Sequence, residues 1–250
     1  MGRWSEPLAA ACCALLFLLW RFGYPVTSWA ALSPLVALLL VGAGIWLRRV
    51  RLTTAMREGI FLPQARYKNW FTGRVTGLII ATIEGTAIVV AISHFALRAI
   101  WPELLLAAAI GVSTLAAIAL LRRVLVSELR PEFAVAASSW IAAGVALPFC
   151  ILHFWMQQNI LPSPAYLEVS DFLDAMNGSL AELPSRRDGI IEVLSAMQLL
   201  EATVRWMLAS VRDLWGTAVL LFSYNAMICI AIARFFADIS VSFNVIRAQP

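Results

Sequence analysis

Long apolar runs separated by short polar segments dominate the chain. Crossing the hydrocarbon core of a bilayer takes about 20 apolar residues in an α-helix. Five windows meet this requirement, and a sixth at the N-terminus is weaker because Arg21 follows a short apolar run. The windows, in chain order and with the weaker one first, are 7–26, 28–47, 75–98, 103–121, 133–155 and 215–236. The pattern predicts an all-α, polytopic bundle of about six transmembrane helices, with residues 1–250 forming a single membrane domain.

The N-terminal window has two interpretations, a retained span or a secretory signal peptide. The leading segment MGRWSEP carries one arginine and one glutamate, which makes a poor positively charged n-region. We therefore favour a span that is not cleaved.

The composition agrees with a membrane protein. Hydrophobic residues make up 61% of the chain and charged residues 14%, whereas about a quarter of a soluble domain is charged. The net charge of +4 would suggest nucleic acid in a soluble protein. Here the positive charge is better explained by arginines that flank the spans. We therefore expect these arginines to contact the lipid bilayer, and we expect no nucleic-acid partner.

The distribution of arginine predicts the orientation. Positively charged loops stay on the cytoplasmic side of a membrane. The segment 48–74 is basic, with Glu58 its sole acid, and the segment 156–214 holds eight acids against four arginines. The basic residues of 48–74 are Arg48, Arg49, Arg51, Arg57, Arg66, Lys68 and Arg74. We therefore expect a bacterial inner-membrane protein with cytoplasmic termini, a cytoplasmic loop 48–74 and an extracytoplasmic excursion 156–214.

The two long connections have their own patterns. Loop 48–74 mixes arginines with large apolar residues, which indicates either an anchor on the anionic leaflet or a docking element for a cytoplasmic partner. In the excursion, Ser163 and Pro164 predict the start of a helix over 164–183, broken at Asn177-Gly178.

A second, amphipathic helix is predicted over 188–213. No proline separates it from the last span, so it can run unbroken into residues 215–236. Its polar side, which includes Gln198, Glu201 and Arg205, is expected to be solvated. Its apolar stripe needs a cover, which the preceding helix, a neighbouring subunit or the lipid interface can supply.

Glu84 lies near the middle of the predicted span 75–98. A charged carboxylate at this depth is unfavourable by roughly 2.5–3.5 kcal/mol, and no Lys or Arg is predicted at the same depth. Small residues share its helix face, which indicates that it points into the bundle. Two interpretations stay open: a proton or cation site on a transport route, or a neutral clasp that donates a hydrogen bond to Thr114 or Asn225.

Other polar residues are weaker candidates. His94 is a possible extension of the Glu84 site, although helical geometry rotates the two by about 80°. His153 is expected to anchor its span at the interface. Arg234 and Asp238 are four residues apart, so they are predicted to pair along one helix face.

No sequence signature of catalysis or of metal binding is present. We find no HExxH, GxSxG or phosphate-binding loop, and no CxxC or Cys/His cluster among four cysteines and two histidines. The sequence therefore predicts a protein that is not an enzyme and that has no metal or cofactor.

Two functions are compatible with these features. The first is a non-enzymatic subunit of a larger secretion, conjugation or transport assembly, with other membrane proteins as homo- or hetero-oligomeric partners. The alternative is a proton- or ion-coupled solute transporter that works through Glu84. The six spans, cytoplasmic ends and external helices before the last span resemble the permease half of some ABC exporters in topology alone, which implies export.

Overall fold

The computed structural model of the protein describes residues 5–60, 73–128, 133, 137, 140, 144–169, 171–185, 189–210 and 215–246. Over these residues the chain is helical and has no β-strand, as the apolar pattern predicts. The elements are α1 (Ser5–Gly23), η1 (Ser28–Ala31), α2 (Leu32–Ile60), α3 (Arg74–Arg98), α4 (Trp101–Glu128), α6 (Ala146–Asn159), η3 (Ala165–Glu168), α7 (Phe172–Leu180), α8 (Gly189–Ser210) and α9 (Trp215–Ile246).

Five helices of the described chain are long and apolar enough to cross a membrane. These spans are Glu6–Gly23, Ser28–Arg57, Arg74–Arg98, Trp101–Val124 and Ala218–Phe243. The predicted window 133–155 is not among them, because α6 has only 14 residues and most of residues 129–143 lie outside the described part. The fold is thus consistent with a helical membrane bundle.

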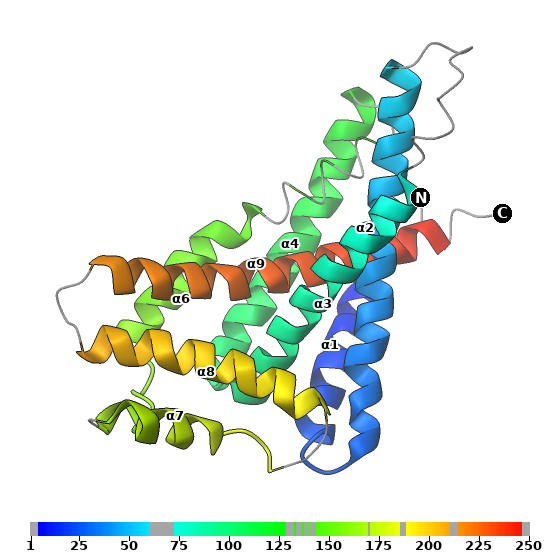
Figure 1. The fold of residues 1–250 in the computed structure, drawn as a ribbon. Coiled ribbons are helices and arrows are strands. Elements are labelled where there is room, and N and C mark those ends of the chain that lie inside the picture. The colour runs from blue at the N-terminus through cyan, green and yellow to red at the C-terminus, as the bar shows by residue number, and fades with distance from the viewer. Residues whose placement is uncertain are drawn as a thin grey trace.

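Helix α9 is the centre of the bundle. It contacts α1, α2, α3, α4, α6 and α8, and Figure 1 shows it crossing α2, α3 and α4 rather than running beside them. From Ala231 to Ser242 nearly every position of α9 is buried. This half of α9 is enclosed by its neighbours, and its buried positions include the charged residues Arg234 and Asp238 as well as apolar ones.

Helix α8 turns back on α9 instead of continuing into it. The two helices pack together and run in opposite directions in Figure 1, with α7 alongside α8. The expectation of one unbroken helix through residues 188–236 is therefore wrong. The inward side chains of α8 contact both α3 and α9. These contacts favour the folded-back arrangement.

The start of α7 also differs from the prediction. Pro164 precedes the 3₁₀ turn η3, and α7 begins after Asp171, whose carboxylate accepts hydrogen bonds from the backbone N–H groups of Leu173 and Asp174. Aspartate is among the best N-cap residues. Asn177 and Gly178 lie inside α7, because contacts with α8 outweigh the weak helix propensity of these two residues.

The predicted loop 48–74 is partly helical. Helix α2 continues to Ile60, since residues 48–58 contain neither glycine nor proline. Arg48 and Arg49 are therefore on a helix that faces the bundle. Arg51 and Arg57 are partly exposed on the same helix and Arg74 is exposed at the start of α3, whereas Arg66 and Lys68 lie outside the described residues.

A glycine brings α2 and α9 into close contact. A methyl group added at Gly44 would lie 2.1 Å from the carbonyl oxygen of Asp238 on α9. Two residues earlier, a methyl group on Gly42 would be 4.0 Å from its nearest neighbour, the carbonyl oxygen of Ala81. Small residues allow this kind of approach between membrane helices.

We expect Gly44→Ala to destabilise the protein, because the added carbon meets backbone rather than a flexible side chain. Overpacking in a tight core is unfavourable by about 1–3 kcal/mol. Gly42→Ala is the matched control: it should be neutral, or stabilising by up to about 1 kcal/mol of helix propensity. Thermal unfolding of both variants in one detergent measures the difference, and equal melting temperatures would contradict the close approach.

Candidate functional site

Five charged side chains from α2, α3 and α9 form one connected group, which we call the arginine network. Its members are Arg48, Arg49, Glu84, Arg234 and Asp238. Arg48 Nη1 donates to Asp238 Oδ1 at 2.8 Å, and Arg234 Nε donates to Asp238 Oδ2 at 3.1 Å. Arg234 Nη2 reaches Glu84 Oε2 at 3.3 Å, and Arg49 Nη2 reaches Glu84 Oε1 at 2.5 Å. The pairing of Arg234 with Asp238 confirms the prediction from their four-residue spacing.

Glu84 therefore has partners other than those expected. Its carboxylate is paired with Arg49 and Arg234, and no hydrogen bond in the described part of the chain joins it to Thr114 or Asn225. Because α2 extends beyond the predicted span, Arg49 reaches the depth of Glu84. Asn225 donates to Gln157 Oε1 at 2.7 Å instead, and the buried Thr114 hydroxyl has no hydrogen-bond partner among the described residues.

The arginine network connects three helices through ion pairs. The Asp238 side chain is fully buried, whereas that of Glu84 is 32% exposed. The indole ring of Trp140 lies 5.4 Å from the Arg48 guanidinium and 4.9 Å from that of Arg234, which adds cation–π attraction. Removing one partner of a buried ion pair is strongly destabilising, so this network has a clear structural role.

A second polar group lies nearer the C-terminal end of α3 and the N-terminal end of α9, and we call it the histidine cluster. Five helices, α3, α4, α6, α8 and α9, contribute to it. Its members are His94, Arg98, Glu103, His153, Gln157, Gln198, Glu201, Arg205, Tyr224 and Asn225.

One half of the cluster is a chain of hydrogen bonds around His94. Its Nε2 lies 2.8 Å from Gln198 Oε1, and its Nδ1 lies 3.4 Å from the Tyr224 hydroxyl. The same hydroxyl donates to Glu201 Oε2 at 2.8 Å. The imidazole of His94 is therefore connected to a buried carboxylate through a phenol.

Glu201 is held in its ionised form. Arg205 Nε lies 2.7 Å from Glu201 Oε1, and Arg98 pairs with the same oxygen. Burial by itself would raise the pKa of this carboxyl, but Arg205, Arg98 and further polar contacts together lower the pKa to about 2. Glu201 is therefore a fixed negative charge at neutral pH rather than a proton carrier.

The other half of the cluster is centred on His153. Its Nε2 lies 3.1 Å from Glu103 Oε1 and 3.4 Å from Gln157 Nε2, while its Nδ1 lies 3.9 Å from Cys229 Sγ. Interfacial anchoring of His153 stays a prediction as to depth, but its side chain is buried in the bundle and is not exposed to lipid or water. A carboxylate on the neighbouring α4 supplies the partner that makes this burial favourable.

A small cavity lies between the two halves. Its volume is about 20 Å³, and its lining includes His94, His153, Glu103, Glu201 and Tyr224. This is enough for about one water molecule, which also needs several polar partners. Both requirements are met here.

A larger polar pocket adjoins this cavity. It has a volume of about 460 Å³ and lies between the end of α6, the following turn, α8 and the start of α9. Gln157 and Arg205 line both the pocket and the cavity. Gln157 and Arg205 therefore lie where the cavity beside the histidines meets the larger pocket.

The geometry of the described residues favours a hydrogen-bonded network over a metal centre. Within that part of the chain, no three His, Cys, Asp or Glu side chains are placed to hold one metal ion. The cluster can instead exchange protons between neighbouring oxygen and nitrogen atoms, with histidine as the side chain suited to do so near neutral pH.

The arginine network and the histidine cluster are separate. Glu84 and His94 are ten residues apart on α3, about 15 Å along a helix. Val89 and Ile92 of α3 and Phe235 of α9 belong to the apolar core between them. His94 is thus not a direct extension of a Glu84 site, in agreement with the rotation between the two positions.

Most of the cluster has no distinctive sequence pattern, because its charged members lie near helix ends or on α8. Arg98 lies at the end of α3 and Glu103 lies in the first turn of α4. Charged side chains at helix ends are ordinarily exposed to water. On α8 the polar residues Gln198 and Glu201 are buried, although we expected that side to be solvated. The four-residue spacing of Glu201 and Arg205 was a usable signal for an ion pair.

No protein-family model, no curated protein and no solved structure matches this chain.

Glu201 should make the stability of the protein depend on acid pH. Its pKa is about 2 in the folded protein, below the ordinary 4.5, so its stabilisation is complete above about pH 4.5 and is lost as the pH falls towards 2. The loss should be on the order of 3 kcal/mol. Thermal unfolding between pH 6 and pH 2 measures it.

Glu201→Gln should be less stable than wild type at pH 6 and should lose less of its remaining stability on acidification. Glu192→Gln, at an exposed carboxylate on the same helix, should behave like wild type. Parallel pH profiles for wild type and Glu201→Gln would show that Glu201 does not have this role.

Proposed function

We propose that the protein is a polytopic membrane transporter, coupled to protons or another small ion, in which the histidine cluster is the ion site. The observation that carries this proposal is the set of titratable side chains from five helices around one water-sized cavity. Ionisable residues inside a membrane bundle are rare and mark ion pathways by default. The proposal moves the transport site from Glu84 to His94 and His153.

The adjoining spaces support an access route from one side. The pocket of about 460 Å³ meets the cavity at Gln157 and Arg205. Between Glu84 and His94 along α3 lie Val89 and Ile92, which belong with Phe235 to the buried apolar core and favour a barrier towards the arginine network. A transporter requires such a barrier, which opens only when the helices move relative to one another.

The charge distribution supports an orientation for this route. Glu6 at the start of α1 pairs with Arg122 near the end of α4 at 3.1 Å, at the end of the bundle where α2 also finishes (Figure 1). Arginines gather at this end, which the positive-inside rule makes cytoplasmic. The proposed protein is then a bacterial inner-membrane protein with about six spans, whose α7 and α8 and polar pocket are extracytoplasmic.

The test is proton flux into liposomes that contain the purified protein and a pH-sensitive dye, driven by an imposed membrane potential. His94→Gln combined with His153→Gln should reduce the flux at least tenfold, because both imidazoles beside the cavity are removed while hydrogen-bonding groups remain. Glu84→Gln is the matched control outside the cluster, and its flux should persist even if its stability falls.

Two measurements separate loss of function from loss of folding. Each variant must elute as wild type does on size exclusion and retain cooperative unfolding. Undiminished flux in a folded double variant would refute the histidine site, and flux lost in Glu84→Gln alone would return the site to Glu84.

A second candidate function is a non-enzymatic subunit of a larger membrane assembly. One observation favours it: α8 carries apolar side chains on its outer surface. Three of these side chains follow one another at seven-residue intervals. Val193 is 47% exposed, Leu200 is 49% exposed and Met207 is 37% exposed. This helix lies outside the candidate spans, and an exposed apolar stripe on such a helix indicates a protein or lipid contact.

If a protein covers this stripe, Leu200→Ser combined with Met207→Ser should reduce the mass of the complex extracted in a mild detergent. Leu173→Ser, at a 68% exposed position on α7, is the control and should leave that mass unchanged. Light scattering coupled to size exclusion measures it, and a monomeric wild-type protein would exclude the assembly.

A further inference from the structure

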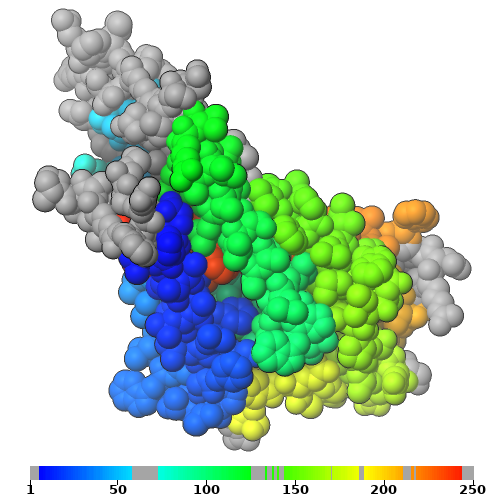
Figure 2. All heavy atoms as spheres, turned by 180° about the vertical axis from the view of Figure 1, so that it is seen from behind, coloured from blue at the N-terminus to red at the C-terminus, as the bar shows by residue number. Residues whose placement is uncertain are grey.

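An apolar groove lies between α1 and α4, on the face opposite to that of Figure 1. Its volume is about 240 Å³. Figure 2 shows α1 and α4 side by side on this face, with atoms of α9 visible in the gap between them. The groove is therefore a lateral opening between two candidate membrane spans, with the central helix as its floor.

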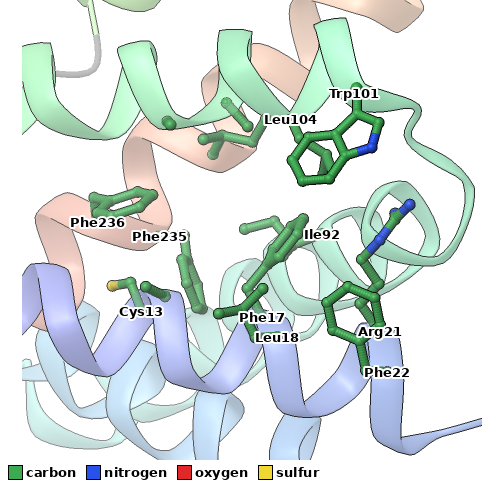
Figure 3. Close-up of a pocket in the computed structure, with 14 residues that line it drawn as sticks. Cys13, Phe17, Leu18, Arg21, Phe22, Ile92, Trp101, Leu104, Phe235 and Phe236 are labelled. Carbon is green, nitrogen blue, oxygen red and sulfur yellow. The ribbon is translucent and has the colours of Figure 1, made fainter.

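The walls of the groove are almost entirely apolar. Phe17 and Phe22 of α1, Leu104 of α4, and Phe235 and Phe236 of α9 surround the space (Figure 3). Water is a poor occupant of such a space, since it needs two to four polar partners. Engineered apolar cavities of about 150 Å³ stay dry and take up benzene, so a groove of this size suits a hydrocarbon ligand.

One end of the groove is different because it carries a cation. Arg21 is the sole charged residue of the lining, and it lies beside Phe22 and across from Trp101 (Figure 3). Its Nη1 donates to the carbonyl oxygen of Ala96 at 2.5 Å, and the described residues supply no further hydrogen-bond acceptor to the guanidinium. The indole of Trp101 is 76% exposed.

This end also coincides with the ends of two candidate spans. The span Glu6–Gly23 finishes there and the span Trp101–Val124 begins there. Arginine and tryptophan at the ends of spans lie at the level of lipid headgroups. A ligand in the groove would then have its apolar part between the helices and its polar part beside Arg21.

We infer that the groove is a binding site for an anionic phospholipid, with one acyl chain between α1 and α4 and the headgroup phosphate on Arg21. Charge complementarity favours this occupant over an uncharged hydrocarbon, because a guanidinium offers several N–H donors in the planar arrangement that phosphate oxygens accept. The inference is independent of the proposed transport function, since the groove shares no lining residue with the cavity of the histidine cluster.

The experiment is native mass spectrometry of the protein released from nanodiscs that contain equal amounts of phosphatidylglycerol and phosphatidylcholine. Wild type should retain one phospholipid, with phosphatidylglycerol preferred at least fivefold. Arg21→Gln should lose this preference but still retain a lipid, and Arg21→Lys should keep it. Ala108→Phe, which fills the groove from α4, should lose most of the bound lipid.

Matched controls test the position as well as the chemistry. Arg123→Gln removes an exposed arginine at the other end of α4, and Val112→Phe enlarges a 68% exposed residue of α4 outside the groove. Both should bind lipid as wild type does. An unchanged headgroup preference in Arg21→Gln, unchanged lipid retention in Ala108→Phe, or a bound protein in place of lipid would overturn the inference.

Discussion

Charges inside an apolar helix bundle must be paired, and this constraint organises the whole molecule. The clearest case is Asp238, a fully buried carboxylate on the central helix that receives hydrogen bonds from Arg48 and Arg234. The pair with Arg48 requires α2 to pass very close to α9, and Gly44 permits that approach. Ion pairing and close helix contact therefore depend on each other at this crossing.

The same constraint explains why α8 buries two polar side chains beside apolar ones such as Leu194. An amphipathic helix in water exposes its polar side, but α8 buries Gln198 and Glu201 and exposes Val193 and Leu200. Arg98 ends its span next to this helix and needs an acidic partner, which Glu201 supplies. The attraction between these charges, in a region of low dielectric, outweighs the exposure of apolar side chains that lipid or a partner protein can cover.

The two polar groups differ in what they can do. The arginine network holds two carboxylates between three guanidinium groups, which do not lose their protons, so it acts as a link between α2, α3 and α9. The histidine cluster contains two imidazoles hydrogen-bonded to neighbouring polar side chains, together with a space for water. Buried apolar side chains of α3, Val89 and Ile92, lie between the two groups along that helix.

The amino-acid pattern by itself determined the fold class, since runs of apolar residues of this length form helices that lipid can cover. It also indicated that Glu84 faces the bundle and that Arg234 pairs with Asp238, because both conclusions depend only on spacing along one helix. The partners of Glu84, the inward direction of Glu201 and the grouping of His94 with His153 were decided by tertiary structure alone. These depend on where a helix ends and how neighbouring helices cross, and local sequence does not encode contacts such as those of Glu84, whose partners are 35 and 150 positions away.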